Sequence, residues 1–389
     1  MSSHPHDGRI LITGGGGFIG SHLANTLVEA GYRVRILDVL HEQVHGSDAS
    51  FPSYLHDDVE CQQGDVRDKD AIRKALAGVS HVYHFAAAVG VGQSMYEIER
   101  YTDINNRGTA VLLEALAQQP VQRLVVASSM SVYGEGLYRR GSENCEPLPR
   151  SHDQLSHGRW EVEFDGKALE PVATPETKRA VPTSVYALSK YDQEQLCLIF
   201  GNAYRIPTVA LRFFNVYGPQ QSLNNPYTGV LAIFASRCLN KNSPLIFEDG
   251  EQRRDFVSVW DIAQACRLAL TTQATGEVFN IGSGRSRSVR EVADSMIEAI
   301  GADVEPMITG KYRVGDIRHC FADITKAKQL LGYSPRVRFE DGLVELAEWL
   351  TETTAIDNYT QAAAELDRRG LTLGRSPSGA FEGAKERPI

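Results

Sequence analysis

Residues 9–20 read Arg9-Ile-Leu-Ile-Thr-Gly14-Gly-Gly-Gly-Phe-Ile-Gly20, and this stretch decides the fold. The apolar run before Gly14 predicts a buried parallel strand, and residues 21–29 predict a helix. Glycines at positions 14, 17 and 20 allow a tight turn, close approach of the backbone to a pyrophosphate, and close helix–strand packing. A diphosphate is favoured at the helix N-terminus. The stretch therefore predicts a dinucleotide-binding unit; a flexible glycine loop is the alternative.

A carboxylate after the next strand indicates which dinucleotide is bound. The predicted strand Arg33–Asp38 ends eighteen residues past Gly20. A carboxylate at this position can accept hydrogen bonds from both ribose hydroxyls of NAD and would repel the 2′-phosphate of NADP. Arg33 and Arg35 lie within the strand and are poorly placed to bind that phosphate. The sequence predicts NAD as the cofactor.

The alternation of strands and helices continues beyond Asp38. It predicts an α/β fold with a doubly wound parallel Rossmann sheet and a smaller C-terminal substrate-binding domain. Ligands of such sheets bind beyond the carboxyl ends of the strands. Further strands are predicted at 59–63, 81–85, 123–127 and 208–213, and helices at about 69–77 and 107–118. Gly14, Asp38, Asp65, Ala86 and the pair Ser128-Ser129 all follow predicted strand ends.

The composition excludes several classes of protein. A net charge of -9 over 389 residues argues against a nucleic-acid partner. The absence of an apolar run of about 18 residues predicts no membrane span. Six cysteines are scattered singly, which indicates free buried thiols in a reducing cytoplasm. Cys145, His152 and His157 lack the paired short spacings of a zinc site, and no metal is expected.

Tyr186-Ala-Leu-Ser-Lys190 is a candidate catalytic pair. Tyr186 and Lys190 share a face of a predicted helix, on which Leu188, Leu196 and Ile199 mark an apolar side. Two unit charges about 4 Å apart interact by about 4 kcal/mol at an effective dielectric constant near 20. The ammonium could therefore lower the pKa of the phenol by up to about 3 units. Tyr-x3-Lys also occurs by chance on many helices, so the prediction depends on the nucleotide site.

The ordered motifs together resemble the extended short-chain dehydrogenase/reductase family, in its NAD-dependent sugar epimerase/dehydratase branch. The resemblance covers about residues 8–350. It implies Ser129, Tyr186 and Lys190 as the catalytic set. The landmarks are Thr13-Gly-Gly-Gly-Gly-Phe-Ile-Gly20, Asp65-Val66, Asn105-Asn-Arg-Gly-Thr109, Ser128-Ser-Met-Ser-Val-Tyr-Gly134, Tyr186-x3-Lys190, Leu211-Arg-Phe-Phe-Asn-Val-Tyr-Gly-Pro219, Arg254-Asp-Phe-Val257 and Arg313-x-x-Asp316.

The same resemblance implies the binding residues, with a dTDP- or UDP-linked sugar as substrate and a homodimer built on helices 107–118 and 186–204. Arg254 and Arg313 would hold the diphosphate; surface ion pairs with Asp255 and Asp316 are the alternative. The cofactor set is Gly14, Gly17, Phe18, Ile19, Gly20, Asp38, Asp65, Val66, Phe85, Ala86, Asn105, Ser128, Tyr186, Lys190 and Phe213. The substrate set is Ser129, Asn215, Leu245, Phe247, Arg254, Arg313 and Asp316.

The expected domains are discontinuous. Residues 8–212 and 255–281 form the NAD-binding domain, and residues 213–254 and 282–350 the substrate domain. Residues 351–389 are expected to hold a helix at 356–369 and a disordered tail. The 56 residues between Ser129 and Tyr186 include an insertion at about 137–181. It is expected to be an irregular surface lobe anchored by Trp160 and Phe164.

The residues after Ser129 limit the reaction. Dehydratases of the resembled family carry acidic residues there, and decarboxylases commonly carry a glutamate; Met130 and Ser131 cannot act as carboxylate acid or base. This favours an NAD-dependent nucleotide-sugar 4-epimerase. Met130, the insertion, Asn225-Pro-Tyr-Thr-Gly229 and Arg368-Arg-Gly-Leu371 most resemble the dTDP-L-rhamnose 4-epimerase group. A UDP-sugar 4-epimerase (for glucose, N-acetylglucosamine or glucuronate), an NAD(P)H-dependent ketoreductase and a non-catalytic NAD-binding protein remain alternatives.

Overall fold

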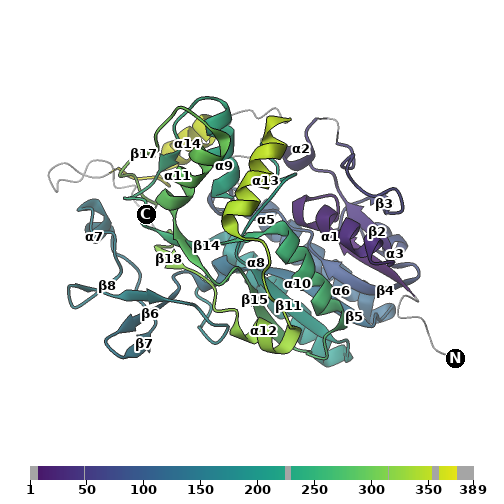
Figure 1. Cartoon of the computed structure of the whole chain (residues 1–389). Helices are drawn as coiled ribbons and strands as arrows, with labels where there is room; N and C mark the ends of the chain where they lie inside the picture. The colour runs from purple at the N-terminus through teal and green to yellow at the C-terminus, as the bar shows by residue number, and fades with distance from the viewer. Residues whose placement is uncertain (1–7, 48, 224–228, 314, 353–358, 375–389) are drawn as a thin grey trace.

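One parallel sheet of seven strands organises the molecule (Figure 1). The computed structural model describes residues 8–47, 49–223, 229–313, 315–352 and 359–374. Neighbouring strands of this sheet are all parallel, which confirms the predicted doubly wound α/β fold. The strand order is β15 (Glu277–Ile281), β11 (Thr208–Phe213), β5 (Arg123–Ser129), β4 (Val79–His84), β1 (Arg9–Thr13), β2 (Arg33–Asp38) and β3 (Glu60–Gln63).

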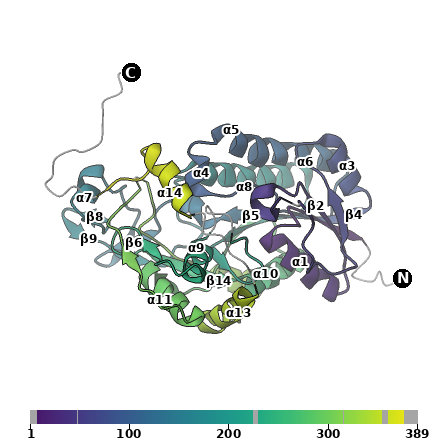
Figure 2. The same ribbon diagram turned by 90° about the horizontal axis from the view of Figure 1, so that it is seen from above.

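Helices cover both faces of the sheet (Figure 2). One face carries α3 (Lys69–Leu76), α6 (Gly108–Gln118) and α8 (Val185–Tyr204), and the other carries α1 (Phe18–Glu29) and α10 (Val259–Thr271). The strands are apolar on both sides: Ile10 and Ile12 belong to one core cluster and Leu11 to the other. Continuous apolar runs are typical of parallel strands buried on both faces.

A π-helix at Thr102–Arg107 precedes α6 and was not predicted. Asn105 lies within this turn and is fully buried. π-Helical turns are rare and frequent at functional sites. The helix predicted from residue 107 therefore begins later, at Gly108, and the preceding turn presents Asn105 to the sheet.

The remainder of the chain forms a smaller layer beside the sheet. Strands β12 (Asn215–Tyr217), β14 (Arg253–Ser258), β16 (Ser286–Ser288) and β18 (His319–Cys320) pair with one another. A second core lies between α9 (Val230–Leu239), α11 (Val289–Ile300) and α13 (Phe339–Thr351). Strand β14 crosses the predicted domain boundary at 254/255.

The C-terminal region contains α14 (Tyr359–Arg368), close to the predicted helix, and Gly370 follows it with φ +69°. The disordered tail predicted for residues 371–389 is wrong at its start, because Leu373 forms a β-bridge with Tyr312. The rest of that tail from residue 375, and the Asn225–Thr228 part of the motif named above, lie outside the described residues. Among the described residues, no helix has both the length and the apolar character needed to cross a bilayer.

The insertion is not irregular as expected. An antiparallel sheet is formed by β6 (Leu137–Arg140), β7 (Glu143–Cys145) and β10 (Glu170–Val172). Between β7 and β10 the chain forms the short helix α7 (His152–Ser156) and the hairpin of β8 (Glu163–Phe164) and β9 (Lys167–Ala168). Its buried apolar residues are Tyr138, Val162 and Leu169. The predicted anchor Phe164 is wrong, because its side chain is 39% exposed and lies against the Arg140 guanidinium. Strands this short show too little alternation to be recognised from sequence.

Two further expectations need correction. All six cysteines are free, but Cys61 is exposed and Cys145 half-buried. On α8, Leu188, Leu196 and Ile199 face outward, with exposed fractions of 52%, 37% and 65%. The buried face of this helix instead carries polar side chains, including Lys190.

Candidate active site

The glycine-rich turn after β1 lies against the end of β4. Gly14 has φ +71°, and a Cβ there would lie 2.7 Å from the backbone nitrogen of Ala86. A Cβ on Gly20 would lie 2.4 Å from the carbonyl oxygen of Gly14. Both distances exclude a side chain. Helix α1 begins at Phe18, directly after this turn, and its N-terminus is not covered by a side chain of Gly14. It lies at the edge of the sheet where the strand order reverses between β1 and β4. This is the position where doubly wound sheets bind a pyrophosphate.

Asp38 is fixed at the end of β2. Its Oδ2 accepts from the Gly16 amide at 3.0 Å and its Oδ1 accepts from the Leu40 amide at 2.9 Å. His45 Nε2 lies 3.6 Å from Oδ1. The carboxylate is therefore held beside the glycine turn with acceptor capacity left over for ribose hydroxyls. The glycine cradle and Asp38 together fit NAD.

Other predicted cofactor residues brace this edge of the sheet. Asp65 is paired with Arg67, whose guanidinium Nε donates to Oδ1 at 2.9 Å. Val66 is buried under Gly108. Asn105 accepts from the Ala88 amide at 2.7 Å and donates to the Ala88 carbonyl at 3.1 Å. The loop after β4 is thereby fixed to the π-helix.

Aromatic side chains complete this region. The Phe85 ring makes edge-to-face contacts with Tyr83 and Phe213, with centroids 5.7 and 5.9 Å apart. Ile19 packs at the edge of the core of the α1 face.

Ser129 and Tyr186 meet where β5 packs on the first turn of α8. Ser129 Oγ accepts from the amide and the hydroxyl of Ser131 at 3.2 and 2.9 Å, and it is hydrogen-bonded to Tyr186. Burial raises the pKa of Tyr186, and the Ser129 hydrogen bond offsets only part of that rise. The predicted lowering by Lys190 is therefore wrong for this structure, because burial dominates the pKa of the phenol and Ser129, not Lys190, is the group that opposes it.

Lys190 is buried and bonded elsewhere. Its Nζ donates to Gln193 Oε1 at 2.6 Å, and burial lowers the pKa of Lys190 to about 8. Gln193 Nε2 donates to Thr109 Oγ1 at 2.9 Å and to the Ala86 carbonyl at 3.3 Å. Gln193 is not among the site residues predicted from the sequence. Its signal was the i,i+3 spacing from Lys190, which puts a polar side chain on the same buried face.

A neutral histidine supports this arrangement. His84 Nδ1 lies 2.8 Å from Thr13 Oγ1, and its Nε2 lies 2.9 Å from Thr109 Oγ1. Burial, followed by the charge of Lys190, lowers the pKa of His84 to about 3. The end of β1, the end of β4 and Gln193 are thus joined by one chain of polar contacts.

Ser128 points to a different partner from Ser129. Its hydroxyl donates to Glu194 Oε2 at 2.6 Å, and Arg212 donates to both oxygens of Glu194 at 2.9 and 2.7 Å. Glu194 is fully buried. Met130 is also buried, in the core cluster, and does not present a polar group. The segment after Ser129 therefore supplies hydroxyls and no carboxylate.

The predicted substrate residues lie in the smaller layer. The Arg313 guanidinium lies 4.6 Å above the Phe247 ring, and its buried Nε has no hydrogen-bond partner in the described part of the chain. The buried Oδ1 of Asn215 likewise has none there. Leu245 begins β13 (Leu245–Ile246), which pairs with β17 (Met307–Ile308). Asp316 Oδ1 accepts from the Ile317 amide at 2.9 Å.

Arg254 is committed to the backbone. Its guanidinium donates to the carbonyls of Ile317 and Arg318 at 2.5 and 3.0 Å. Asp255 is buried and accepts from Ser283 and the Gly284 amide, so an Arg254–Asp255 surface ion pair is wrong. Arg254 positions the segment that carries Arg313, and its role toward a diphosphate stays a prediction.

The model of the NAD dependent epimerase/dehydratase family matches residues 10–154 and 163–282. A dTDP-L-rhamnose 4-epimerase from Burkholderia thailandensis is 35% identical over 350 residues, covering 88% of this chain and 95% of that protein. The UDP-glucose 4-epimerase of Thermotoga maritima, solved with UDP-glucose, superposes with a TM-score of 0.73 at 32% identity, over 88% of this chain and 99% of that one. The UDP-glucuronic acid 4-epimerase of Bacillus cereus, solved with UDP-glucuronic acid and NAD, gives 0.72 at 28% over the same shares.

Proposed function

Because the chain belongs to the NAD dependent epimerase/dehydratase family, an NAD-dependent group of nucleotide-sugar enzymes, we propose that it is a nucleotide-sugar 4-epimerase. The observation that carries this proposal is the set of groups around Ser129. Ser131 adds a second hydroxyl there, and Met130 is turned into the core. Elimination of water from a sugar needs a carboxyl acid or base beside the catalytic tyrosine, whereas transfer of one proton needs only the tyrosine itself.

Tyr186 is the proposed base for the C4 hydroxyl. Ser129 accepts from Ser131 and is bonded to Tyr186, so it can hold the sugar hydroxyl and the phenol in line. Bound NAD, held by the glycine turn and Asp38, would supply the acceptor and donor for the C4 hydride and, while oxidised, a positive ring charge. Lys190 supplies a second positive charge that favours the phenolate once its ammonium is turned from Gln193 toward the tyrosine. Tyr186 then gives the proton back to the C4 oxygen.

For the substrate we propose dTDP-L-rhamnose. Support comes from the 35% identity to the Burkholderia thailandensis enzyme and from the sequence features shared with that group. A UDP-sugar is the alternative, and the two Thermotoga maritima and Bacillus cereus structures with UDP-sugars favour it. Asp38 supports NAD over NADP, because its carboxylate would repel a 2′-phosphate.

We further propose that two copies associate through α8. Leu188, Leu196 and Ile199 form an exposed apolar stripe on this helix, and Ile98 of the neighbouring α5 (Ile98–Tyr101) is 54% exposed. Covering such a stripe with the same surface of a second copy removes apolar area from water on both sides. The mass of the purified protein by light scattering tests this directly.

Incubation with a panel of dTDP- and UDP-sugars tests the reaction. The expected result is interconversion of one C4 pair without added reductant. Tyr186→Phe should retain bound NAD and lose turnover. A stoichiometric need for NAD(P)H would instead assign a ketoreductase, and activity in Tyr186→Phe would mean that another group is the base.

A further inference from the structure

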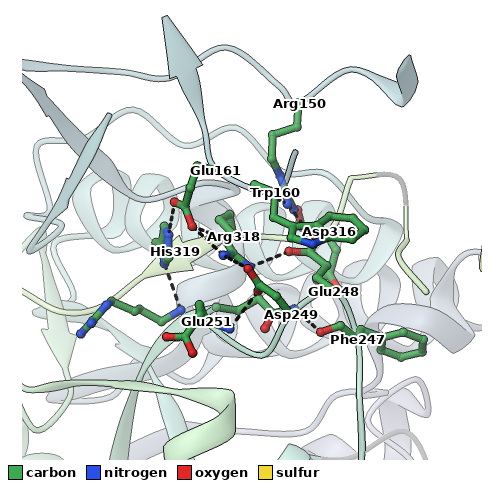
Figure 3. A network of polar contacts seen from close by, with 12 residues as sticks. Arg150, Trp160, Glu161, Phe247, Glu248, Asp249, Glu251, Asp316, Arg318 and His319 are labelled. Atoms are coloured by element: carbon green, nitrogen blue, oxygen red, sulfur yellow. Dashed lines mark hydrogen bonds and ion pairs between the residues drawn. The ribbon is translucent and has the colours of Figure 1, made fainter. Parts of the chain in front are cut away.

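The insertion contributes two charged side chains to a polar network in the smaller layer (Figure 3). Arg150, Glu248 and Arg318 are buried in this network, whereas Glu161 and Asp249 are partly exposed. Glu161 precedes β8, and Arg150 precedes α7. Both point toward Arg318, Glu248 and Asp249 of the smaller layer (Figure 3). Residues 155–162, which include Glu161, are the part of the insertion that the family model leaves unmatched.

Arg318 is the centre of this network. It is fully buried, and its guanidinium donates to Glu161 Oε1 at 2.5 Å, to Glu248 Oε2 at 2.9 Å and to both oxygens of Asp249 at 2.6 and 2.9 Å. Three carboxylates from two separate parts of the chain thus fix one planar group. Burial opposes ionisation of Glu161, but hydrogen bonds from His319 and Arg318 outweigh burial and lower its pKa to about 2.

His319 adds a second bond to Glu161. The amide of Arg253 donates to His319 Nδ1 at 3.0 Å, so the ring proton must sit on Nε2, which lies 2.9 Å from Glu161 Oε2. Glu161 therefore accepts from His319 with one oxygen and from Arg318 with the other. The insertion is thus held to His319 in β18 and to Arg318, the residue directly before β18.

Arg150 makes the second connection. It donates to Glu248 Oε1 at 2.8 Å and to the carbonyl of Asp316 at 2.9 Å. It also donates to the Trp160 carbonyl at 2.9 Å, which ties the two halves of the insertion together. Arg150 is buried.

The segments held in this way are those that carry the proposed nucleotide contacts. Glu248 and Asp249 directly follow Phe247, and Asp316 and Arg318 directly follow the turn of Arg313. The Arg313 guanidinium stacks on Phe247, and its Nε is buried without a hydrogen-bond partner in the described residues. A planar cation stacked on an aromatic ring with an unused donor suits an anionic group next to a flat base. The network thus fixes the chain segments that directly follow Phe247 and Arg313.

Buried ion clusters contribute little net folding stability, because the desolvation of the charges offsets much of their attraction. Their value lies in fixing one geometry. We propose that the insertion is a clamp for the nucleoside-diphosphate end of the substrate, with Glu161 and Arg150 as positioning residues that hold Phe247 and Arg313. This proposal rests on the proposed nucleotide-sugar function. It assigns the insertion to nucleotide affinity and not to the chemistry at C4.

Titration of the full-length, NAD-loaded protein with UDP and with dTDP by calorimetry tests the clamp. The parent protein is expected to bind at least one of the two. Glu161→Gln removes one charge from Arg318 and should raise the dissociation constant of that nucleotide about tenfold or more, with NAD content unchanged. The KM for the nucleotide sugar should rise by a similar factor, whereas kcat should change less than about twofold.

Glu163→Gln is the matched control. Glu163 lies two residues further along the insertion and pairs with Arg159 at the surface, at 3.2 Å. It should bind UDP and dTDP as the parent does. Arg150→Met is the second variant, for the case that Glu161→Gln does not fold. It leaves the Glu161–Arg318 contact intact and should weaken nucleotide binding in the same direction.

The outcomes separate the clamp from the proposed function. If the folded variants bind the nucleotide with the parental dissociation constant, the clamp is refuted while the epimerase proposal stands. If kcat falls and nucleotide binding does not, the insertion acts on the chemistry and the clamp is again refuted. A parent protein that binds neither UDP nor dTDP would overturn the nucleotide-sugar function on which the clamp depends.

Discussion

Replacing Gln193 by Met should move the alkaline limb of the pH–rate profile to lower pH. Gln193 Oε1 is the acceptor for the buried ammonium of Lys190, at 2.6 Å. A hydrogen bond to a charged group contributes about 1.5–3 kcal/mol. At about 1.36 kcal/mol per pKa unit, losing it should lower the pKa of Lys190 by about 1–2 units. Starting from the value of about 8 for Lys190, the pKa of the variant would be roughly 6–7.

The alkaline limb moves to lower pH because of the role of the Lys190 ammonium. Lys190 assists Tyr186 only while charged, so activity is lost as the pH rises through the pKa of Lys190. The assay is kcat/KM against pH for the parent and for Gln193→Met, with bound NAD measured in each preparation. Gln195→Met, on the same helix but half-buried, is the control and should leave the profile unchanged. An unshifted alkaline limb in a Gln193→Met protein that retains NAD would refute the reasoning.

Three further predictions concern the cofactor turn and the core. Gly20→Ala should lower the melting temperature and the NAD content, because its Cβ would lie 2.4 Å from a carbonyl oxygen. Gly17→Ala, whose Cβ meets that oxygen at 3.4 Å, should lose NAD, and its melting temperature should fall less, only by the stabilisation that bound NAD provides. A stable Gly20→Ala with bound NAD would contradict this. His84 is held neutral with its pKa lowered from 6.5 to about 3, so the unfolded state takes up its proton first as the pH falls, and about 5 kcal/mol of stability should be lost between these values. Urea unfolding at several pH values checks it, and an equal slope in His84→Gln would contradict it. Glu194→Gln should lower the free energy of unfolding by about 3–5 kcal/mol, because it leaves the buried Arg212 guanidinium without its counter-charge. Glu114→Gln, in an exposed pair with Lys69, should lower it by less than about 1 kcal/mol. Similar losses in both variants, measured by urea unfolding, would be inconsistent with a buried Glu194–Arg212 pair.

The sheet was predictable because each of its features is local in sequence. The strand before Gly14, the glycines and Asp38 follow one another within thirty residues of chain, and each has a backbone or hydrogen-bonding requirement that few residue types satisfy. The same holds for Tyr186 and Lys190, which are one helical turn apart. The strands and helices that carry these residues, and the order of these elements along the chain, could therefore be predicted from spacing alone.

The charges around these residues were not predictable, because burial depends on the whole fold. The pKa of Tyr186 is raised where the Tyr–Lys spacing predicted a lowered one. Leu196 and its neighbours form an apolar stripe that faces outward, since the sheet side of α8 is taken by Lys190, Gln193 and Glu194. The partners of Glu161 lie more than a hundred residues away along the chain at Arg318 and His319, so no local pattern connects them.

The central claim is that one hydroxyl is oxidised and reduced within a single site. It is tested most directly with the nucleotide sugar that the panel identifies, carrying deuterium at C4, incubated in ordinary water with the protein as purified. Mass spectrometry and NMR of the product should find the C4 epimer with deuterium retained at C4 and no added cofactor required. Loss of the label to solvent, or formation of the epimer only with added NAD(P)H, would contradict the account.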